Sequence, residues 1–518
     1  MARVGDWLES RTGIGKFWRA IFHRRVPVGL NWSYTLGAAA LFVLGLQTVT
    51  GILLGMNYSP SPDRAYDSIL YISETVPFGA FVRGLHHWGA SAMVVLVVLH
   101  LLVVFIQGAY KRPREVTWLA GVVLLLITLG FGFTGYLLPW DQKAYWATTV
   151  GTNMPGTMPL IGPELVALLR GGTELGAVAL SRFYTIHVLL LPALIGLFVL
   201  VHLALVVWHG VSVPARLWHR GLAGLQRLGG GRRGQRRDLA GVRPAAQVDP
   251  EVAPAMEPLP DAVGMTMEQE HERYKAFKAK GPRFWPEVIA EDSVAVLVVF
   301  SVIVLLIAAF GVPTEARADP TDTTYIPRPE WYFMFLFQLV SYFPGNLEWI
   351  GVVVIPGLLV FLLFALPFLS RGTERRAWKR PIGTAVAAVV LVGAGVLTVL
   401  AYQSTPPSVV VEDGTVLTSQ QLRGRQLIVQ QGCNSCHVIA GQGSRKGPWL
   451  DGIGQRMTAG DIHFFMEKPK AFNPAASMEP VIPPLTHEDV EAITQYLLTL
   501  DEKAVEAAQS GEKEVSSR

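Results

Sequence analysis

The sequence predicts an all-α protein in which seven transmembrane helices are followed by a small helical domain. Of the 518 residues, 51% are apolar and only 16% are charged, whereas ordinary globular proteins have about 25% charged residues. Seven apolar stretches come close to or exceed the ~20 residues that a helix needs to cross a bilayer. After the last of these stretches the chain becomes polar enough for a soluble domain.

The predicted transmembrane stretches are separated by loops of unequal charge. The stretches lie at about 32–56, 86–107, 116–138, 184–208, 291–312, 348–370 and 382–402. Lys and Arg cluster in the N-terminal segment, in the turns around residues 111–114 and 371–380, and after the fourth stretch. Seven spans place all of these segments on one side, and cytoplasmic loops are the ones enriched in basic residues. We therefore expect a cytoplasmic N-terminus and a C-terminal domain outside the cell.

Hydropathy and composition divide the chain into five predicted segments. These are a four-helix membrane domain at 1–210, a cytoplasmic linker at 211–285, a three-helix membrane domain at 286–404, a soluble domain at 405–505 and a disordered tail at 506–518. The linker is predicted because it mixes Gly, Arg, Pro and Ala before it becomes charged. In the soluble domain, apolar residues recur at helical spacing over 487–500. The small net charge of +4 does not indicate nucleic-acid binding.

Four histidines lie inside the second and fourth predicted helices. Residues His86 and His100 are 14 apart and His187 and His202 are 15 apart, so each helix carries two histidines near one face and ~21 Å apart. The two helices run parallel, which pairs His86 with His187 near the outer surface and His100 with His202 near the inner surface. Because ionisable groups inside a membrane are costly and usually functional, we expect two bis-histidine haem b sites.

Two glycine pairs repeat the spacing of the histidines. Gly37 and Gly51 lie 14 residues apart in the first helix, and Gly121 and Gly135 lie 14 apart in the third. A porphyrin needs close approach of the backbone, which glycine permits. The alternative is that these small residues only pack membrane helices against one another.

The two cysteines of the chain form a haem c attachment motif, Cys433-Asn434-Ser435-Cys436-His437. Their thiols form thioethers to the haem, and His437 supplies one axial nitrogen. A redox dithiol or half of a zinc site is the rival interpretation, but the adjacent histidine and the lack of further cysteines disfavour both. Haem c is attached outside the cytoplasm, which agrees with the topology expected from the loop charges.

The haem c also requires a sixth ligand. Met478 is the first candidate, because it precedes a predicted helix and a thioether ligand raises the haem potential. Met457, His463 and Met466 are the alternatives.

Together these features resemble cytochrome b of the cytochrome bc complexes, the quinol:cytochrome c or plastocyanin oxidoreductases. Spans five to seven resemble the three-helix companion subunit of the chloroplast-type complex, here fused behind the four-helix part and followed by a cytochrome c domain. The motifs that carry the resemblance are His86-x13-His100, His187-x14-His202, Lys111-Arg112-Pro113-Arg114-Glu115, Gly135-Tyr136-Leu137-Leu138-Pro139-Trp140-Asp141-Gln142 and Pro329-Glu330-Trp331-Tyr332.

The resemblance implies quinol oxidation at the outer membrane face with electron bifurcation. One electron would pass to a Rieske iron–sulfur subunit and on to haem c, and the other through two b haems to quinone at the inner face, coupled to proton translocation. Glu330 would accept a quinol proton, with Tyr332 and Tyr136 in the same pocket. Arg83 and Arg114 would neutralise haem propionates. Because haem c uses both cysteines, the Rieske centre must lie on a separate subunit.

The resemblance also implies a homodimeric complex in a bacterial plasma membrane, with a soluble or membrane-bound electron acceptor. The expected cofactors are two haem b and one covalently bound haem c, since no cysteine lies outside 433–436. The alternative function is a di-haem b membrane anchor, or an electron conduit, of a dehydrogenase complex. Copurification with a Rieske protein distinguishes the two.

Overall fold

The computed structural model describes residues 22–215, 266–320, 327–403, 418–469 and 485–500, except for a few positions at 344, 441 and 444–446, together with scattered positions before residue 22. The chain forms two compact units. The first comprises Met1–Ala318 and Leu339–Ala394, and the second comprises Asp319–Gln338 and Gly395–Arg518.

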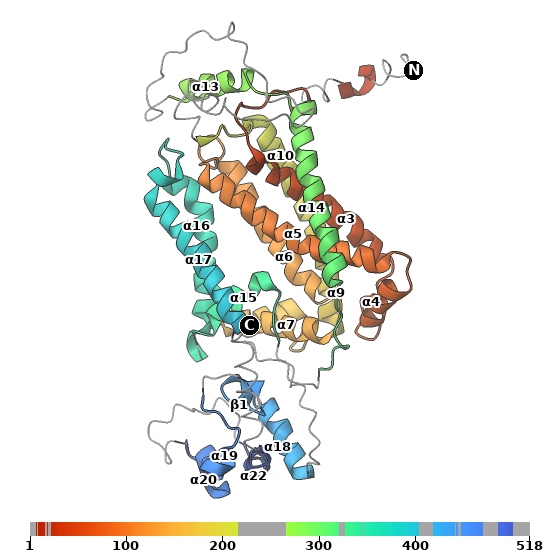
Figure 1. The fold of residues 1–518 in the computed structure, drawn as a ribbon, viewed down its shortest axis with the longest axis vertical. Helices are drawn as coiled ribbons and strands as arrows, with labels where there is room; N and C mark the ends of the chain where they lie inside the picture. Colours follow the sequence, from red (N-terminus) through yellow and green to blue (C-terminus); the bar gives the residue numbers. More distant parts are fainter. Residues whose placement is uncertain are drawn as a thin grey trace, which may run out of the picture. The chain divides into compact units, whose positions relative to one another are not determined.

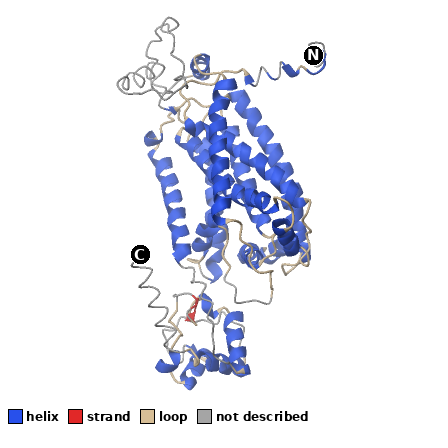
Figure 2. Ribbon diagram, turned by 45° about the vertical axis from the view of Figure 1, so that its right-hand side comes forward, coloured by secondary structure: helices blue, strands red, loops and turns tan. Residues whose placement is uncertain are grey.

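Helices dominate the described residues, which confirms the predicted all-α class (Figures 1 and 2). Within the described part of the chain, seven helical segments are long and apolar enough to cross a membrane. They are η1 (Trp32–Thr35) with α3 (Leu36–Gly55), α5 (Gly79–Ile106), α6 (Glu115–Tyr136), α9 (Ala177–Thr185) with η3 (Ile186–Leu190) and α10 (Leu191–His209), η5 (Phe284–Val288) with α14 (Ile289–Phe310), η8 (Ile350–Val354) with α16 (Ile355–Leu369), and α17 (Pro381–Gln403).

Three of the seven segments begin earlier than their hydropathy predicts. The segments that start at Gly79, Ala177 and Phe284 each gain about two turns at the N-terminal end. These extra turns contain polar residues, such as Arg83 and Arg182. A hydropathy pattern marks only the part that is apolar throughout, whereas the backbone hydrogen bonds of the helix continue beyond it.

The first unit packs α3 against α5 and α6 against α10. Side chains of α3, α5 and α14 pack together as an apolar core. This core includes Val43, Met93 and Ile303. Many large apolar side chains on the outer faces are exposed, for example Leu200 (69%) and Val389 (72%). An apolar outer surface suits helices whose surroundings are lipid rather than water.

Shorter helices connect the membrane-spanning ones at one end of the first unit. They are α4 (Ala65–Glu74), α7 (Gln142–Asn153), η2 (Met154–Thr157) and α8 (Gly162–Arg170). Buried Arg170 of α8 links this helix to α7, because its guanidinium donates to the Thr152 hydroxyl (2.7 Å) and to the Thr149 carbonyl (2.7 Å); it also donates to the Thr173 carbonyl (3.0 Å). Other short elements of the chain are η6 (Trp331–Phe333), α15 (Met334–Val340), η7 (Gly345–Leu347) and η9 (Ala377–Lys379).

Part of the predicted linker forms a helix, α13 (Met267–Ala279). Thr266 begins it with a capping box, since its side chain accepts from the Gln269 amide and the Gln269 side chain accepts from the Thr266 amide. Two acidic residues in the first turn, Glu268 and Glu270, complement the helix dipole. Residues 216–265 of the predicted linker, and the predicted tail at 506–518, lie outside the described residues.

The second unit contains the predicted soluble domain. Its elements are α18 (Ser419–Gln430), η10 (Cys433–Ser435), β1 (Val438–Ile439), β2 (Gln442–Gly443), α19 (Ile453–Arg456), α20 (Ala459–Glu467) and α22 (His487–Leu497). The strands form one two-residue antiparallel ladder. Helix α18 packs against α22 around a core that contains Ile428, Ile462 and Ile493. The predicted helix at 487–500 is present as α22.

Candidate functional site

The outer histidine pair lies between α5 and the fourth span. The ring centroids of His86 and His187 are 6.3 Å apart. Imidazole nitrogens bind first-row metal ions at ~2 Å, so two rings that share one ion have centroids ~6 Å apart. The separation therefore suits a single metal ion held between the two rings.

Two threonines determine which nitrogen of each outer histidine carries the proton. The Thr50 hydroxyl lies 3.0 Å from Nδ1 of His86, and the Thr134 hydroxyl lies 3.1 Å from Nδ1 of His187. Each hydroxyl donates its own hydrogen to a backbone carbonyl of its helix, at 2.7 and 2.8 Å. A hydroxyl has one hydrogen, so each threonine oxygen accepts from the imidazole Nδ1–H. The Nε2 atoms keep their lone pairs, as metal ligation requires.

Glycines of neighbouring helices lie directly against these rings. A β-carbon on Gly51 of α3 would stand 3.2 Å from Cε1 of His86. A β-carbon on Gly135 of α6 would stand 2.5 Å from Cε1 of His187. The absence of a side chain at both positions thus lets each imidazole lie against the backbone of the adjacent helix.

The inner histidine pair repeats this arrangement. A β-carbon on Gly37 would stand 3.2 Å from Cε1 of His100, and one on Gly121 would stand 3.4 Å from Cε1 of His202. The two histidines are close enough to interact electrostatically. All four predicted glycines therefore contact the four predicted histidines, one to one. The glycine cradles of both pairs, and the Nε2 lone pairs of the outer pair, fit haem held between two histidines.

His187 lies in a π-helical segment, η3, which the sequence analysis did not predict. Such segments are rare and often occur at functional sites. Pro192 follows directly in the first turn of α10, and since proline cannot donate to an α-helical ladder, it is a signal that could have suggested an irregularity here.

The structure places Arg83 against the loop that follows α14. Its guanidinium donates to the Ser73 hydroxyl (3.2 Å) and to the carbonyls of Val312 (3.2 Å) and Pro313 (3.3 Å). Arg83 therefore has a clear structural role, which the sequence analysis did not anticipate. Its predicted contact with a haem propionate stays a prediction.

Arg114 is buried at the opposite end of the helices. It donates to the carbonyls of Gly210 (2.9 Å) and His209 (3.3 Å) and lies over the ring of Tyr274. Burial lowers the pKa of Arg114, and the neighbouring Tyr274 raises it. Arg375, which the sequence analysis did not single out, is also buried, and burial together with the Arg114 charge lowers its pKa. Two buried guanidinium groups favour an anionic group, and a propionate is one such group.

The segment Gly135–Gln142 is tied to the loop that leads towards the Pro329–Tyr332 motif. Residues 140–142 and 316–318 form an antiparallel bridge with backbone hydrogen bonds of 2.9 and 3.0 Å. Tyr136 is the last residue of α6, and Nζ of Lys143 lies 5.7 Å from the centroid of its ring. Contact between these two distant segments could not be inferred from the sequence.

Glu330 and Tyr332 belong to the second unit. Glu330 precedes η6, and its carbonyl accepts from the Phe333 amide at 2.8 Å, while its carboxylate makes no capping hydrogen bond. Burial raises the pKa of Tyr332, and the charge of Glu330 adds to the effect. The two side chains are therefore close neighbours within this unit.

The Cys433–His437 motif forms a tight turn. The amides of Cys436 and His437 both donate to the carbonyl of Cys433, at 3.1 and 2.9 Å. Nδ1 of His437 lies 2.8 Å from the carbonyl oxygen of Pro448. Because a carbonyl only accepts, Nδ1 carries the proton and Nε2 keeps its lone pair for iron. A β-carbon on Gly447 would stand 2.6 Å from Cε1 of His437, so this ring also lies against a glycine.

The candidates for the sixth ligand of haem c are only partly described. Met478 lies outside the described residues. Met457 and Met466 pack against the apolar core of the domain. His463 faces Glu467 and His487 instead.

Paired imidazoles within a bundle of membrane-spanning helices define a membrane-bound b-type cytochrome. The comparisons agree, and the chain belongs to the cytochrome b family. Residues 21–210 match "Cytochrome b/b6/petB", residues 317–418 match "Cytochrome b(C-terminal)/b6/petD" and residues 421–501 match "Cytochrome c".

Several relatives cover the N-terminal part of the chain. It is 42% identical to cytochrome b6 of Acaryochloris marina over 214 residues, which are 41% of this chain and 100% of that protein. It is 43% identical to the menaquinol:cytochrome c reductase cytochrome b subunit of Geobacillus thermodenitrificans over 221 residues, 41% of this chain and 98% of that one. A solved structure titled "Hyperthermophilic respiratory Complex III" matches with a TM-score of 0.60 and 25% identity, over 78% of this chain and 92% of that chain.

Proposed function

We propose that this chain is the fused cytochrome b and cytochrome c subunit of a quinol:cytochrome c oxidoreductase. It oxidises quinol at the outer membrane face, sends one electron to a Rieske iron–sulfur subunit and the other across the membrane to quinone, and couples this to proton translocation. The observation that carries the proposal is the presence of two imidazole pairs, each set against glycines, in a helix bundle with a haem c attachment turn on the same chain.

The four histidines, His86, His187, His100 and His202, would hold two haem b groups, and the Cys433–His437 turn with Met478 would hold one haem c. When bound, these groups supply one-electron transfer at two depths of the membrane and on its outer side. The residues of the chain would orient these haems: threonine hydroxyls accept from Nδ1–H of the outer histidines and leave Nε2 for iron, and the Pro448 carbonyl does the same for His437. Arg83 and Arg114 would lie at the propionates.

Glu330 is the proposed proton acceptor at the quinol site. Its carboxylate would take the proton from a quinol hydroxyl as a general base, and it lies close enough to Tyr332 for its charge to act on that residue. Tyr332, its neighbour, would line the same site. Residues 317–418 match the C-terminal part of cytochrome b. This match favours quinol oxidation over the function of a dehydrogenase membrane anchor, because such an anchor does not require this segment.

The proposed topology follows from loop charge. The N-terminus lies in the cytoplasm and the cytochrome c domain lies outside, in the plasma membrane of a bacterium. The proposed domain boundaries are those predicted from the sequence, with a homodimeric complex and a separate Rieske subunit as partners.

The test uses the complex purified through a tag on this chain. We expect a Rieske iron–sulfur protein to copurify, and reduced menaquinone to reduce haem c only when that protein is present. Pyridine haemochrome spectra after acid–acetone extraction should give two extractable b haems and one covalent c haem per chain. Reduction of haem c by quinol in Rieske-free preparations would contradict the proposal.

A further inference from the structure

Two helices of the cytochrome c domain carry the same short pattern, a histidine followed four residues later by a glutamate. Helix α20 contains His463 and Glu467, and α22 contains His487 and Glu491. Residues four apart lie on one face of a helix, and α20 and α22 pack against each other. The four side chains therefore meet between the two helices.

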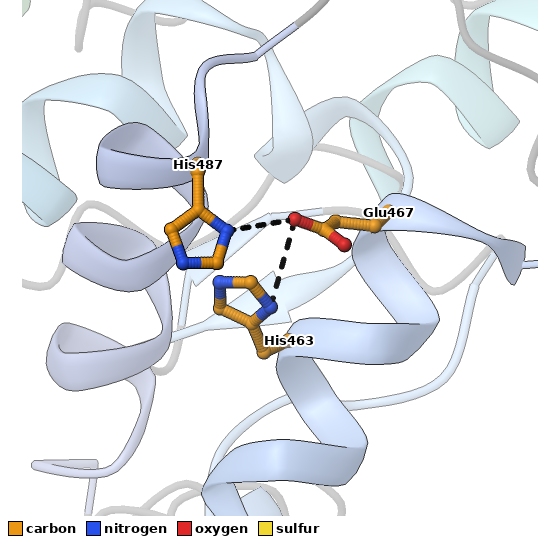
Figure 3. Close-up of side chains that lie close together, drawn as sticks. All are labelled: His463, Glu467 and His487. Carbon is orange, nitrogen blue, oxygen red and sulfur yellow. Dashed lines mark hydrogen bonds and ion pairs between the residues drawn. The ribbon is translucent and has the colours of Figure 1, made fainter.

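Figure 3 shows His463, Glu467 and His487 pointing towards one another. Nδ1 of His487 lies 3.0 Å from Oε1 of Glu467, and Nδ1 of His463 lies 3.8 Å from the same oxygen. The two imidazole rings have centroids 4.5 Å apart. One ligand atom from each of the three residues lies within 4.8 Å of the others. A tetrahedral ion with ligands at ~2.0–2.1 Å spaces them ~3.3 Å apart, so small side-chain movements complete such a site.

The second nitrogen of His463 has a distinct environment. Nε2 is buried without a hydrogen-bond partner among the described residues, and the carboxylate of Glu491 lies 4.0 Å from it. Metal-bound histidines usually donate their other N–H to a carboxylate, which orients the ring. Glu491 lies where such a partner is needed.

We propose that His463, Glu467 and His487 bind a divalent transition-metal ion of the Zn²⁺ type, with Glu491 orienting His463. Two imidazoles and one carboxylate suit zinc, whereas magnesium and calcium prefer oxygen ligands alone. Water takes the fourth position, because three protein ligands leave a tetrahedral ion one open site. The ion enters from solvent, since the side chain of His487 is 78% exposed.

The position of the site gives the ion a structural effect. Helix α20 ends at Glu467 and α22 begins at His487, so the ligands hold the two ends of the segment that joins these helices. A simple ion pair between exposed groups contributes little to such a link. A metal ion bound from both helices joins them directly.

Zinc binding to the full chain tests the proposal. The purified complex is dialysed against a chelator and then against Zn²⁺ alone, and zinc is counted per haem c. We expect His487→Ala and Glu467→Gln each to bind one tight zinc fewer than the unsubstituted chain. Glu491→Gln should weaken binding about 10–100-fold. Glu488→Gln is the matched control, because Glu488 is 82% exposed and pairs with Arg423 instead.

A second measurement examines the ligands of the zinc ion directly. The fine structure of X-ray absorption beyond the zinc edge should show scattering from two imidazoles in the unsubstituted complex. The signal of two imidazoles should be lost in His487→Ala. Intact haem c absorption in each variant shows that the domain is folded. Equal zinc content in all proteins, or zinc without imidazole scattering, would overturn the proposal.

Discussion

Gly135 lies so close to His187 that a β-carbon on the glycine would stand 2.5 Å from Cε1 of the imidazole. Real β-carbons essentially never approach another atom so closely. The corresponding distances for Gly37, Gly51 and Gly121 from their histidines are 3.2, 3.2 and 3.4 Å. The position of each imidazole therefore depends on a glycine of the next helix, most strongly at Gly135.

We predict that Gly135→Ala displaces His187 and weakens the outer b haem. Overpacking a filled interior costs about 1–3 kcal/mol, which corresponds to roughly 5-fold to 150-fold weaker binding. Gly121→Ala should have a smaller effect, because its β-carbon needs little movement. Gly130→Ala in the same helix is the control, with its nearest contact at 3.7 Å. Haem b content per haem c measures the series, and equal content in all three variants would refute the graded effect.

Removing a threonine hydroxyl should change the outer haem in a different way. In Thr134→Val, Nδ1–H of His187 loses the threonine acceptor (3.1 Å) and keeps the backbone of Phe131 as a partner, so the imidazole becomes a weaker base. We expect a raised midpoint potential of the outer b haem and about 10–100-fold weaker haem binding. Thr128→Val is the control, because Thr128 lies in the same helix and bonds only a backbone carbonyl. Redox titration of the two b haems is the measurement, and identical potentials would count against this role.

Much of the first unit could be predicted because membrane helices are regular. A spacing of 14 residues translates directly into depth and face, so the two depths that the glycines share with the histidines follow from residue numbers, whereas the contact of each glycine with an imidazole comes from the structure. The histidine at 187 shows the limit. Its π-helical segment changes the register locally, and hydropathy does not detect such a change.

Contacts between distant loops could not be predicted. The bridge between residues 140–142 and 316–318 depends on backbone groups, which every residue possesses and no side-chain pattern marks. Helix α13 is different, since the capping box at Thr266 and Gln269 is visible in the sequence. The Gly- and Pro-rich residues before this helix favoured a linker in its place.

Gly447→Ala should disturb the axial histidine of haem c. The new β-carbon would stand 2.6 Å from Cε1 and 2.7 Å from Nδ1 of His437, so the ring must shift and its bond to Pro448 must lengthen. We expect haem c to stay covalently attached while its axial ligation weakens. Gly460→Ala is the control, with its nearest contact at 3.9 Å. The measurement is the absorption spectrum of the protein with haem c in its reduced state, and an unchanged spectrum in Gly447→Ala would contradict the expectation.

Lys111 should make stability depend on pH. Burial, with the charges of Arg380 and Arg375, lowers the pKa of Lys111 to about 8 from its usual 10.5. Between these values the unfolded chain binds more protons than the folded chain, so the free energy of unfolding rises with pH. Between pH 7 and about pH 9.5, we expect the thermal midpoint of Lys111→Met to rise less than that of the unsubstituted protein. The thermal midpoint of Lys275→Met, at an exposed site, should rise as much as that of the unsubstituted protein. An equal rise in Lys111→Met would refute the role of Lys111 in this pH dependence.

Glu330→Gln should slow quinol oxidation while the haem spectra stay unchanged. Glutamine has the same shape but cannot accept a proton, and general-base catalysis contributes about 10²–10⁴-fold to rate. The backbone of the η6 turn is retained, because the hydrogen bond from Phe333 goes to the Glu330 carbonyl rather than to its carboxylate. The measurement is quinol-dependent reduction of haem c by the complex, with Glu348→Gln as the control carboxylate between α15 and α16. If Glu330→Gln turned over as fast as the control, the proton would have to leave by another group, and Glu330 would not be the acceptor.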